Sequence, residues 1–280
     1  MREITIIKKN GEKQVFNPER LEKSLKRSGA SDEITSRIVS SISAEITDGT
    51  TTDYIYKKAY EMLESEPKQG QARYRYSLRR AVSELGPTGF AFEKFVRDVL
   101  AARGYTTASG IKISGKCVTH EVDVVAENES EKITAELKFH NRINIKTDLK
   151  VALYVNARFL DIAGTDYYGD KTPRPYLITN TKFTSNAKRY AECEGTLDLL
   201  GWDYPKTGEN LHDVIQRSKI HPVTALTSFS KREHSILLDN GFIVCRDIKR
   251  NGGADVYNLG LIKRKNIERA LEEIELICLQ

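Results

Sequence analysis

The stretches HEVDVVA at residues 120–126 and ITAELKF at residues 133–139 decide the fold of this chain. In both, apolar and polar residues alternate over a length typical of a β-strand. Strand side chains point alternately to the two faces, so Glu136 and Lys138 share one face, and the apolar residues of their stretch share the other. If the two strands pair as neighbours, Asp123 lies next to Glu136. The sequence thus predicts two carboxylates and an ammonium group at one place on a sheet.

Helices and strands are predicted to alternate on both sides of this pair. The expected elements are an amphipathic helix at 90–103, strands within 111–139, a helix at 145–160, a strand at 175–179, a helix at 185–194 and a short strand at 197–201. This order predicts an α/β core that ends near Trp202. The remaining chain is expected to be mostly helical.

The first part of the chain begins with a predicted β-hairpin over residues 3–16, since Asn10-Gly11 is a strong hairpin-turn signal. Asn17 is suited to cap a helix that has Pro18 at its first position. Further helices are predicted at 32–46, from Thr52 to about residue 63, and at 71–85. The helix-breaking GPTG at residues 86–89 predicts a domain boundary.

These patterns predict an α/β protein, α+β over its whole length, in three parts. The parts are a small N-terminal domain of residues 1–88 with a hairpin and helices, a mixed-sheet core of residues 89–205 flanked by helices, and a mainly helical segment of residues 206–280. A chain of 280 residues is long enough for two or three such units, each with its own core.

Composition limits the class of protein. With 39% apolar and 30% charged residues, the chain is neither disordered nor fibrous. We find no apolar run of bilayer length and no signal-peptide core, so we expect a cytoplasmic protein without a membrane segment. The four cysteines are far apart and form no CxxC pair, which indicates reduced thiols. The net charge of +5 is too small to indicate a polyanion partner by itself.

The residues that carry chemistry are those that phosphodiester hydrolysis requires. Asp123 and Glu136 can hold Mg²⁺ or Mn²⁺ through carboxylate oxygens and share the ion with a substrate phosphate. Lys138 can orient or help deprotonate the attacking water and offset charge on the phosphate. Glu93, on the preceding helix, can add a ligand through water. The site residues expected from the sequence are therefore Glu93, Asp123, Glu136 and Lys138.

This pattern resembles the PD-(D/E)xK nuclease superfamily, and within it the Mrr-type restriction endonucleases. Their order of a helical glutamate, a strand aspartate and Glu-x-Lys is matched in this chain, and the ITNTKFT stretch that begins at Ile178 is similar to the family's later strand. The resemblance spans residues 86–205 and implies a restriction-endonuclease-like fold with metal-dependent catalysis. The aspartate lies in HEVD instead of a glycine-rich context, so Glu121 is a competing metal ligand.

The N-terminal residues IIKKNG, which begin at Ile6, resemble the ATP-cone, the regulatory nucleotide-binding domain of ribonucleotide reductases. The resemblance covers residues 1–88 and implies that ATP or dATP is a regulatory ligand. Departures from the family pattern are Lys9 for arginine, Asn10 for aspartate and Arg20 for lysine. Basic side chains and a helix N-terminus are suited to phosphate binding. The implied contact residues are Lys8, Gln14, Asn17, Arg20 and Thr52.

The C-terminal part contains LLDNGF at residues 237–242, which is similar to a helix-hairpin-helix motif. Such a motif contacts a DNA backbone through amide groups at a glycine turn. A plain helical cap on the core is the alternative. The last predicted helix, residues 265–279, is amphipathic enough to dock or to form a homo-oligomer.

We therefore expect a metal-dependent endonuclease that hydrolyses DNA phosphodiester bonds and responds to an adenine nucleotide. Two alternatives remain open: a nucleotide-responsive DNA-binding regulator without cleavage activity, and a nuclease specific for RNA or for nucleic-acid junctions.

Overall fold

The computed structural model describes residues 3–8, 10–66 and 70–278, which form two compact units. One unit extends to Leu78 and the other runs from Arg79 to Cys278. The division lies inside helix α4 (Gly70–Ser83), before the glycine-proline break at which the sequence places a boundary. The end of α4 belongs to the second unit because the Ala81 carbonyl accepts a hydrogen bond from Thr224 Oγ1 at 2.6 Å.

The first unit opens with a hairpin of β1 (Thr5–Ile7) and β2 (Lys13–Val15), paired antiparallel. Gly11, at φ +83°, gives the turn the left-handed backbone that glycine allows. Lys9, one of the departures from the ATP-cone pattern, lies outside the described residues. The hairpin precedes α1 (Pro18–Arg27), α2 (Asp32–Glu45) and α3 (Thr52–Glu64).

Each of these helices begins at a side-chain cap. Asn17 accepts the Arg20 amide, Ser31 accepts the Ile34 amide, and Thr51 accepts the Tyr54 amide. The apolar faces then meet in one core of buried residues, which includes Ile6, Leu21, Leu25, Ile38, Ile42, Ile55, Ala59 and Leu63. The short hairpin is therefore held by helix packing as well as by its own ladder.

The described residues of the second unit contain a five-stranded mixed sheet in the order β3-β4-β5-β7-β9. Strands β3 (Thr106–Ser114), β4 (Thr119–Glu127) and β5 (Glu131–Lys138) pair antiparallel. Strands β7 (Thr172–Thr179) and β9 (Asp198–Leu200) then follow parallel to β5. Parallel neighbours need helical crossovers, which place helices on the sheet.

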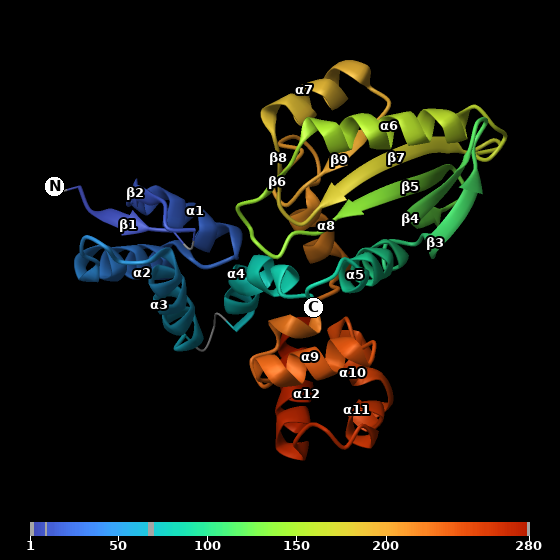
Figure 1. Ribbon diagram of the computed structural model, residues 1–280. Helices are drawn as coiled ribbons and strands as arrows, with labels where there is room; N and C mark the ends of the chain where they lie inside the picture. The colour runs from blue at the N-terminus through green and yellow to red at the C-terminus, as the bar shows by residue number, and fades with distance from the viewer. Residues whose placement is uncertain (1–2, 9, 67–69, 279–280) are drawn as a thin grey trace. The chain divides into compact units, whose positions relative to one another are not determined.

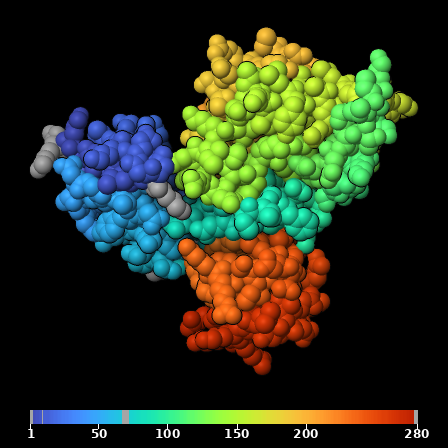
Figure 2. Space-filling view, in the orientation of Figure 1, coloured from blue at the N-terminus to red at the C-terminus, as the bar shows by residue number. Residues whose placement is uncertain are grey.

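Helices cover both faces of the sheet (Figure 1). Helix α5 (Phe90–Ala101) contacts β3 and β4, while α6 (Leu149–Ala163) lies against β7 and beside α7 (Ser185–Glu194). In Figure 2 the atoms of α6 (yellow-green) form a continuous part of the visible surface. Two short strands, β6 (Lys146–Thr147) and β8 (Lys182–Phe183), pair parallel near the starts of α6 and α7.

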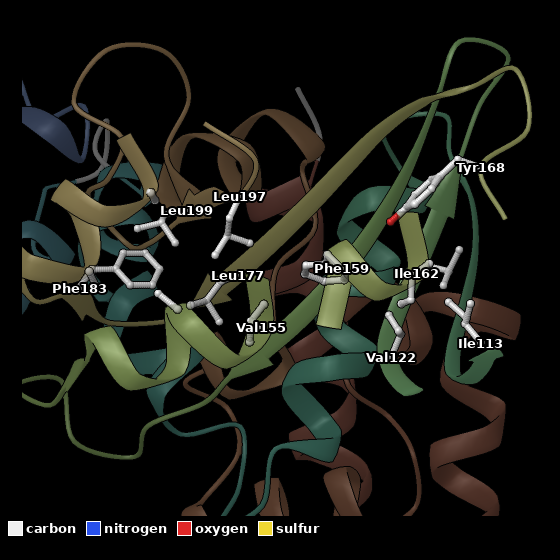
Figure 3. Packing of buried hydrophobic residues seen from close by; sticks show 14 residues of the cluster. Ile113, Val122, Val155, Phe159, Ile162, Tyr168, Leu177, Phe183, Leu197 and Leu199 are labelled. Carbon is white, nitrogen blue, oxygen red and sulfur yellow. The ribbon is translucent and has the colours of Figure 1, made fainter. Parts of the chain in front are cut away.

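The core between α6 and the sheet is apolar and continuous (Figure 3). Phe159 and Ile162 of α6 lie over Val122 and Ile113, and Val155 lies beside Leu177. Phe159 is 2% exposed and Ile162 is fully buried. At the far end of this core, the Tyr168 hydroxyl and Thr134 Oγ1 are 2.7 Å apart. This packing fixes where the polar residues of α6 meet the strands.

The C-terminal part is helical, as the sequence predicts. It comprises α8 (Leu211–Ser218), η2 (Val223–Ala225), α9 (Lys231–Asp239), α10 (Cys245–Lys249), η3 (Arg250–Gly253), α11 (Ala254–Asn258) and α12 (Arg264–Cys278). Gly241, at φ +81°, forms the turn after α9, and its carbonyl accepts a hydrogen bond from Lys94 Nζ at 2.7 Å. The end of the last predicted helix, Leu279, lies outside the described residues.

The α/β fold class predicted from the sequence is confirmed, while some element boundaries were wrong. The helix expected from residue 145 begins at Leu149, because Asp148 caps it and the two residues before the cap pair in β6. The strand expected at 175–179 begins at Thr172, since β7 pairs with the whole length of β5. Among the described residues, no helix combines the length and the apolar character needed to cross a membrane.

We predict that Phe159→Ala lowers the free energy of unfolding by about 3–5 kcal/mol, because it leaves a cavity in the core between α6 and the sheet. The neighbouring Leu160 is 51% exposed, so Leu160→Ala is a matched control with an expected change within about 0.5 kcal/mol. Urea denaturation followed by circular dichroism measures both changes. Equal losses in the two variants would contradict this description of the core.

Candidate active site

The site lies where strands β4 and β5 stop pairing. Their backbone register ends at Val124 opposite Ala135. Beyond that pair, the Leu137 amide donates to Asp123 Oδ2 at 2.7 Å. Its acceptor is therefore a side-chain carboxylate and not a backbone carbonyl of β4. Asp123 is thereby held beside the Glu136-Leu137-Lys138 segment at a defined place between the strands.

Glu136 is buried, at 4% exposure, and its carboxylate is surrounded by hydrogen-bond donors. Oε1 accepts from Lys138 Nζ at 2.6 Å and from the Tyr154 hydroxyl at 2.9 Å. Oε2 accepts from Arg158 Nη1, which also donates to the Glu121 carbonyl at 3.0 Å. A buried carboxylate requires such compensation because it has lost its hydration.

These contacts set the ionisation of the pair. Burial alone raises the pKa of Glu136, but the hydrogen bond and charge of Lys138 and the charge of Arg158 outweigh it, so the pKa lies below its usual range. Burial by itself lowers the pKa of Lys138, an effect opposite to that on Glu136. The hydrogen bonds of Lys138 to Glu136 and Tyr154 outweigh burial, so the pKa of Lys138 is raised. Both groups are therefore ionised near neutral pH.

The other two acidic residues carry the opposite shift. Burial and the nearby Glu136 charge raise the pKa of Asp123 against the opposing effect of the Leu137 amide. Burial raises the pKa of Glu93, and the charges of Asp123, Glu136 and Glu121 add to this rise. The structure thus brings Glu93, Asp123, Glu136 and Lys138 into one electrostatic cluster, with Glu121 at its edge.

Polar residues at the end of β7 and directly after it hold the end of β5 in place. Thr179 Oγ1 donates to the Lys138 carbonyl at 2.7 Å. Asn180 accepts the His140 amide at 2.9 Å and donates back to the His140 carbonyl at 2.8 Å. The threonine-asparagine segment noted in the sequence therefore fixes the backbone that carries Lys138.

Sequence reasoning missed Tyr154 and Arg158. Both lie on α6, one turn apart, and their side chains reach the same carboxylate of Glu136. Their spacing of four residues in a predicted helix is a signal for a shared face. It does not reveal that this face meets β5.

The donor set fits a hard divalent cation. Carboxylate oxygens are the ligands that Mg²⁺ and Mn²⁺ take. Burial, and after it the charges of neighbouring carboxylates, raise the pKa values of Asp123 and Glu93, and a bound cation would offset those charges. In the described part of the chain, no three Asp, Glu, His or Cys side chains converge as around a bound metal. Glu136 instead faces Lys138 and Arg158.

A cavity of about 430 Å³ lies elsewhere in the second unit. Its walls include Arg103, Tyr105, Arg174, Tyr176 and Tyr204. The four sequence-predicted catalytic residues do not line it. The candidate site is therefore defined by its charged cluster and by the end of the β4–β5 ladder.

In the first unit, the expected nucleotide contacts lie near the hairpin and the helix starts. Lys8 Nζ pairs with Glu12 at 2.8 Å, and Arg20 Nη1 donates to Gln14 at 3.5 Å. Asn17 caps α1, so its carboxamide oxygen already accepts an amide. Thr52 is the first residue of α3. Ile7 forms a parallel β-bridge with Thr51, and Lys8 and Thr52 are the residues that directly follow these two.

Comparison with known proteins agrees with this architecture. A family model for the ATP cone domain matches residues 4–84, and one described as AF1548-like, C-terminal, matches residues 221–278. An uncharacterised protein of Archaeoglobus fulgidus is 35% identical over 179 residues, which are 64% of this chain and 98% of that relative. The chain belongs to the AF1548-like family. Its N-terminal region is an ATP-cone domain, so that expectation is confirmed.

The crystal structure of AF1548, a protein of unknown function, superposes on this AF1548-like protein with a TM-score of 0.54. The two are 33% identical, and the match covers 69% of this chain and all of AF1548. A more distant structure is the MspJI restriction endonuclease in complex with a 27-mer oligonucleotide, with 13% identity and a TM-score of 0.35, covering 74% of this chain and 43% of that one. Another is Can2 from Sulfobacillus thermosulfidooxidans in complex with cyclic tetra-adenylate, with 14% identity and a TM-score of 0.32, covering 74% of this chain and 64% of that one. Superpositions with TM-scores this low have no bearing on function.

We predict that Asp123→Asn raises the melting temperature in EDTA at pH 7. The asparagine keeps an acceptor for Leu137 and removes a carboxylate whose pKa is raised by burial and by Glu136. Such a group destabilises the fold fully above its folded pKa, and the effect fades as pH falls, ending below the unfolded value of about 3.9. The difference from wild type, measured by calorimetry, therefore narrows on acidification.

The exposed Asp170 provides the matched control, with Asp170→Asn expected to leave the melting temperature unchanged at pH 7 and on acidification. A lower melting temperature for Asp123→Asn at pH 7 would contradict the proposed repulsion among the carboxylates.

Proposed function

We propose that this AF1548-like protein is a metal-dependent endonuclease of the Mrr-type restriction-endonuclease class. It hydrolyses DNA phosphodiester bonds and is regulated by ATP or dATP. In this proposal the ATP-cone of residues 1–88 senses the nucleotide, residues 89–205 perform the chemistry, and residues 206–280 grip the DNA. The observation that carries the proposal is the cluster of Asp123, Glu136 and Lys138 where β4 and β5 stop pairing.

The carboxylates would hold the metal. Asp123 and Glu136 would provide direct oxygen ligands, and Glu93 would bind through a water molecule. When bound, Mg²⁺ or Mn²⁺ supplies positive charge to the phosphate and lowers the pKa of a coordinated water. Glu121 bonds to Arg158 only through its backbone carbonyl, which leaves its carboxylate as an alternative ligand.

Lys138 acts as a cation in this proposal. Its ammonium group orients the water and offsets charge on the phosphate. In hydrolysis, the water oxygen bonds to phosphorus, one phosphorus–oxygen ester bond breaks, and the leaving oxygen takes a proton from solvent to become a hydroxyl. The water's own proton passes to solvent.

The ATP-cone supports adenine-nucleotide binding, and the basic residues at its hairpin are suited to phosphate. Lys8 and Arg20 pair with Glu12 and Gln14, contacts that a triphosphate could replace. The start of α3 at Thr52 provides a helix N-terminus that favours anions. We propose that these residues, with Gln14 and Asn17, form the nucleotide site.

We predict that the purified protein cleaves plasmid DNA in Mg²⁺ and that Asp123→Ala and Lys138→Ala each reduce the rate at least about 100-fold. Asp123→Ala removes a metal ligand, and Lys138→Ala removes the ammonium group that offsets charge on the phosphate. Lys132→Ala is the matched control. Lys132 lies on the same strand, pairs with Glu127 at 3.2 Å, and is expected to be dispensable for cleavage.

Cleavage that survives in both site variants would rule out this site. DNA binding by the wild type without a metal-dependent product would favour the non-cleaving regulator. Products from RNA or from junctions alone would favour the structure-specific nuclease.

We predict that ATP or dATP binds the wild type and that Lys8→Ala weakens binding at least about tenfold, since it removes a charge-assisted bond to phosphate. Isothermal titration calorimetry measures this change. Lys13→Ala, at an exposed position of the same hairpin, is expected to bind as the wild type does. Equal affinities in all three proteins would place the nucleotide elsewhere.

A further inference from the structure

We propose that Arg158 is an internal counter-ion which a divalent cation displaces from Glu136 as it binds, and that the displaced guanidinium then serves the substrate phosphate. Lys138 and Tyr154 keep their hydrogen bonds to the other carboxylate oxygen of Glu136 during this exchange. The inference rests on the proposed function, because it concerns the same carboxylate and the same class of substrate.

The first step of the argument is that both oxygens of Glu136 are already engaged. Lys138 and Tyr154 donate to Oε1, and Arg158 donates to Oε2. Glu136 is also 4% exposed, so little water is available to it. A cation that binds this carboxylate directly must therefore exchange with a donor that is present, and does not simply replace solvent.

The second step identifies which donor leaves. Oε1 has two donors, one of them from the same strand two residues away, whereas Oε2 is bonded by Arg158 alone among these donors. Departure of the guanidinium thus frees one oxygen for a metal while the other stays held. Arg158 comes from α6, and its long side chain has the reach to swing away from β5.

The third step is where the guanidinium goes. Arg158 Nη1 is also bonded to the Glu121 carbonyl at 3.0 Å, and its guanidinium lies 5.6 Å from the Tyr154 ring centre. These contacts can retain the side chain near the site after Glu136 is released. A planar guanidinium in this position matches two phosphate oxygens at once, which an ammonium cannot do.

Charge gives the direction of the effect. The carboxylates of Glu93, Asp123 and Glu136 are partly balanced by Lys138 and Arg158. Removing the Arg158 charge leaves a more negative site and eliminates the competitor for Oε2. Cation affinity should therefore rise even though a phosphate contact is lost. A residue that only supported the site structurally would produce the opposite change.

The test measures Mn²⁺ binding to the full-length protein without nucleic acid, by the loss of the free-ion signal in electron paramagnetic resonance. We predict that Arg158→Met binds Mn²⁺ at least fivefold more tightly than wild type, and that Arg158→Lys and Tyr154→Phe stay within about threefold. Arg189→Met removes an exposed arginine of α7 and controls for net charge. It is expected to match the wild type.

A second measurement uses Ca²⁺ to limit cleavage and follows binding of a fluorescent duplex DNA. Arg158→Met should bind it at least fivefold more weakly, and Arg158→Lys should recover only part of the loss because lysine lacks the two-pronged geometry. Unchanged or weaker Mn²⁺ binding by folded Arg158→Met would overturn the exchange, as would a wild type that binds no Mn²⁺. If Arg158→Met does not fold, Arg158→Gln is used with the same expected outcomes.

The two proposals fail in different ways. Tighter Mn²⁺ binding by Arg158→Met with no DNA cleavage by the wild type would remove the nuclease function and retain the exchange. Cleavage by the wild type with unchanged Mn²⁺ affinity in Arg158→Met would remove the exchange and retain the nuclease function.

Discussion

The buried carboxylate of Glu136 is the constraint on which the second unit's polar structure depends. An ionised carboxylate with 4% exposure is stable only if charged and polar donors replace its hydration, and here they come from β5 itself and from α6. The same contacts tie α6 to the sheet at a fixed rotation. The apolar stripe of α6 lies next to Tyr154 and Arg158 on the helix and packs against the same sheet, so hydrophobic packing and charge compensation support one placement of the helix.

The separation of β4 from β5 gives this carboxylate a partner. Once the backbone ladder ends at Val124, the Asp123 side chain becomes the acceptor for the Leu137 amide, which holds two carboxylates near each other despite their repulsion. The raised pKa of Asp123, caused by burial and by Glu136, is the electrostatic cost of this arrangement. Groups with perturbed pKa values gather at sites where proteins bind cations and perform acid–base chemistry, which is why we propose a hydrolytic function for this place in the fold.

The ATP-cone carries the second proposed site, the one for a nucleotide. Its hairpin and helix starts gather basic groups and backbone amides, and its internal pairs are exposed enough to be exchanged for a ligand at little cost. In both proposed sites, the side chains that would bind a ligand are paired within the chain. In the second unit Glu136 is buried, so our proposal requires a strongly charged ligand to replace its partner.

The sequence by itself determined the fold class, the ATP-cone and the strand that carries Glu136 and Lys138, because these depend on local signals: alternation, capping residues and turn residues. It also predicted that Glu93 lies on the preceding helix and that Asp123 lies on a neighbouring strand. Only the tertiary structure decided that the backbone ladder ends beside Asp123 and that Tyr154 and Arg158 of α6 engage Glu136. The reason is physical: helix periodicity specifies which residues share a face, whereas the partner of a polar face depends on how two distant segments pack.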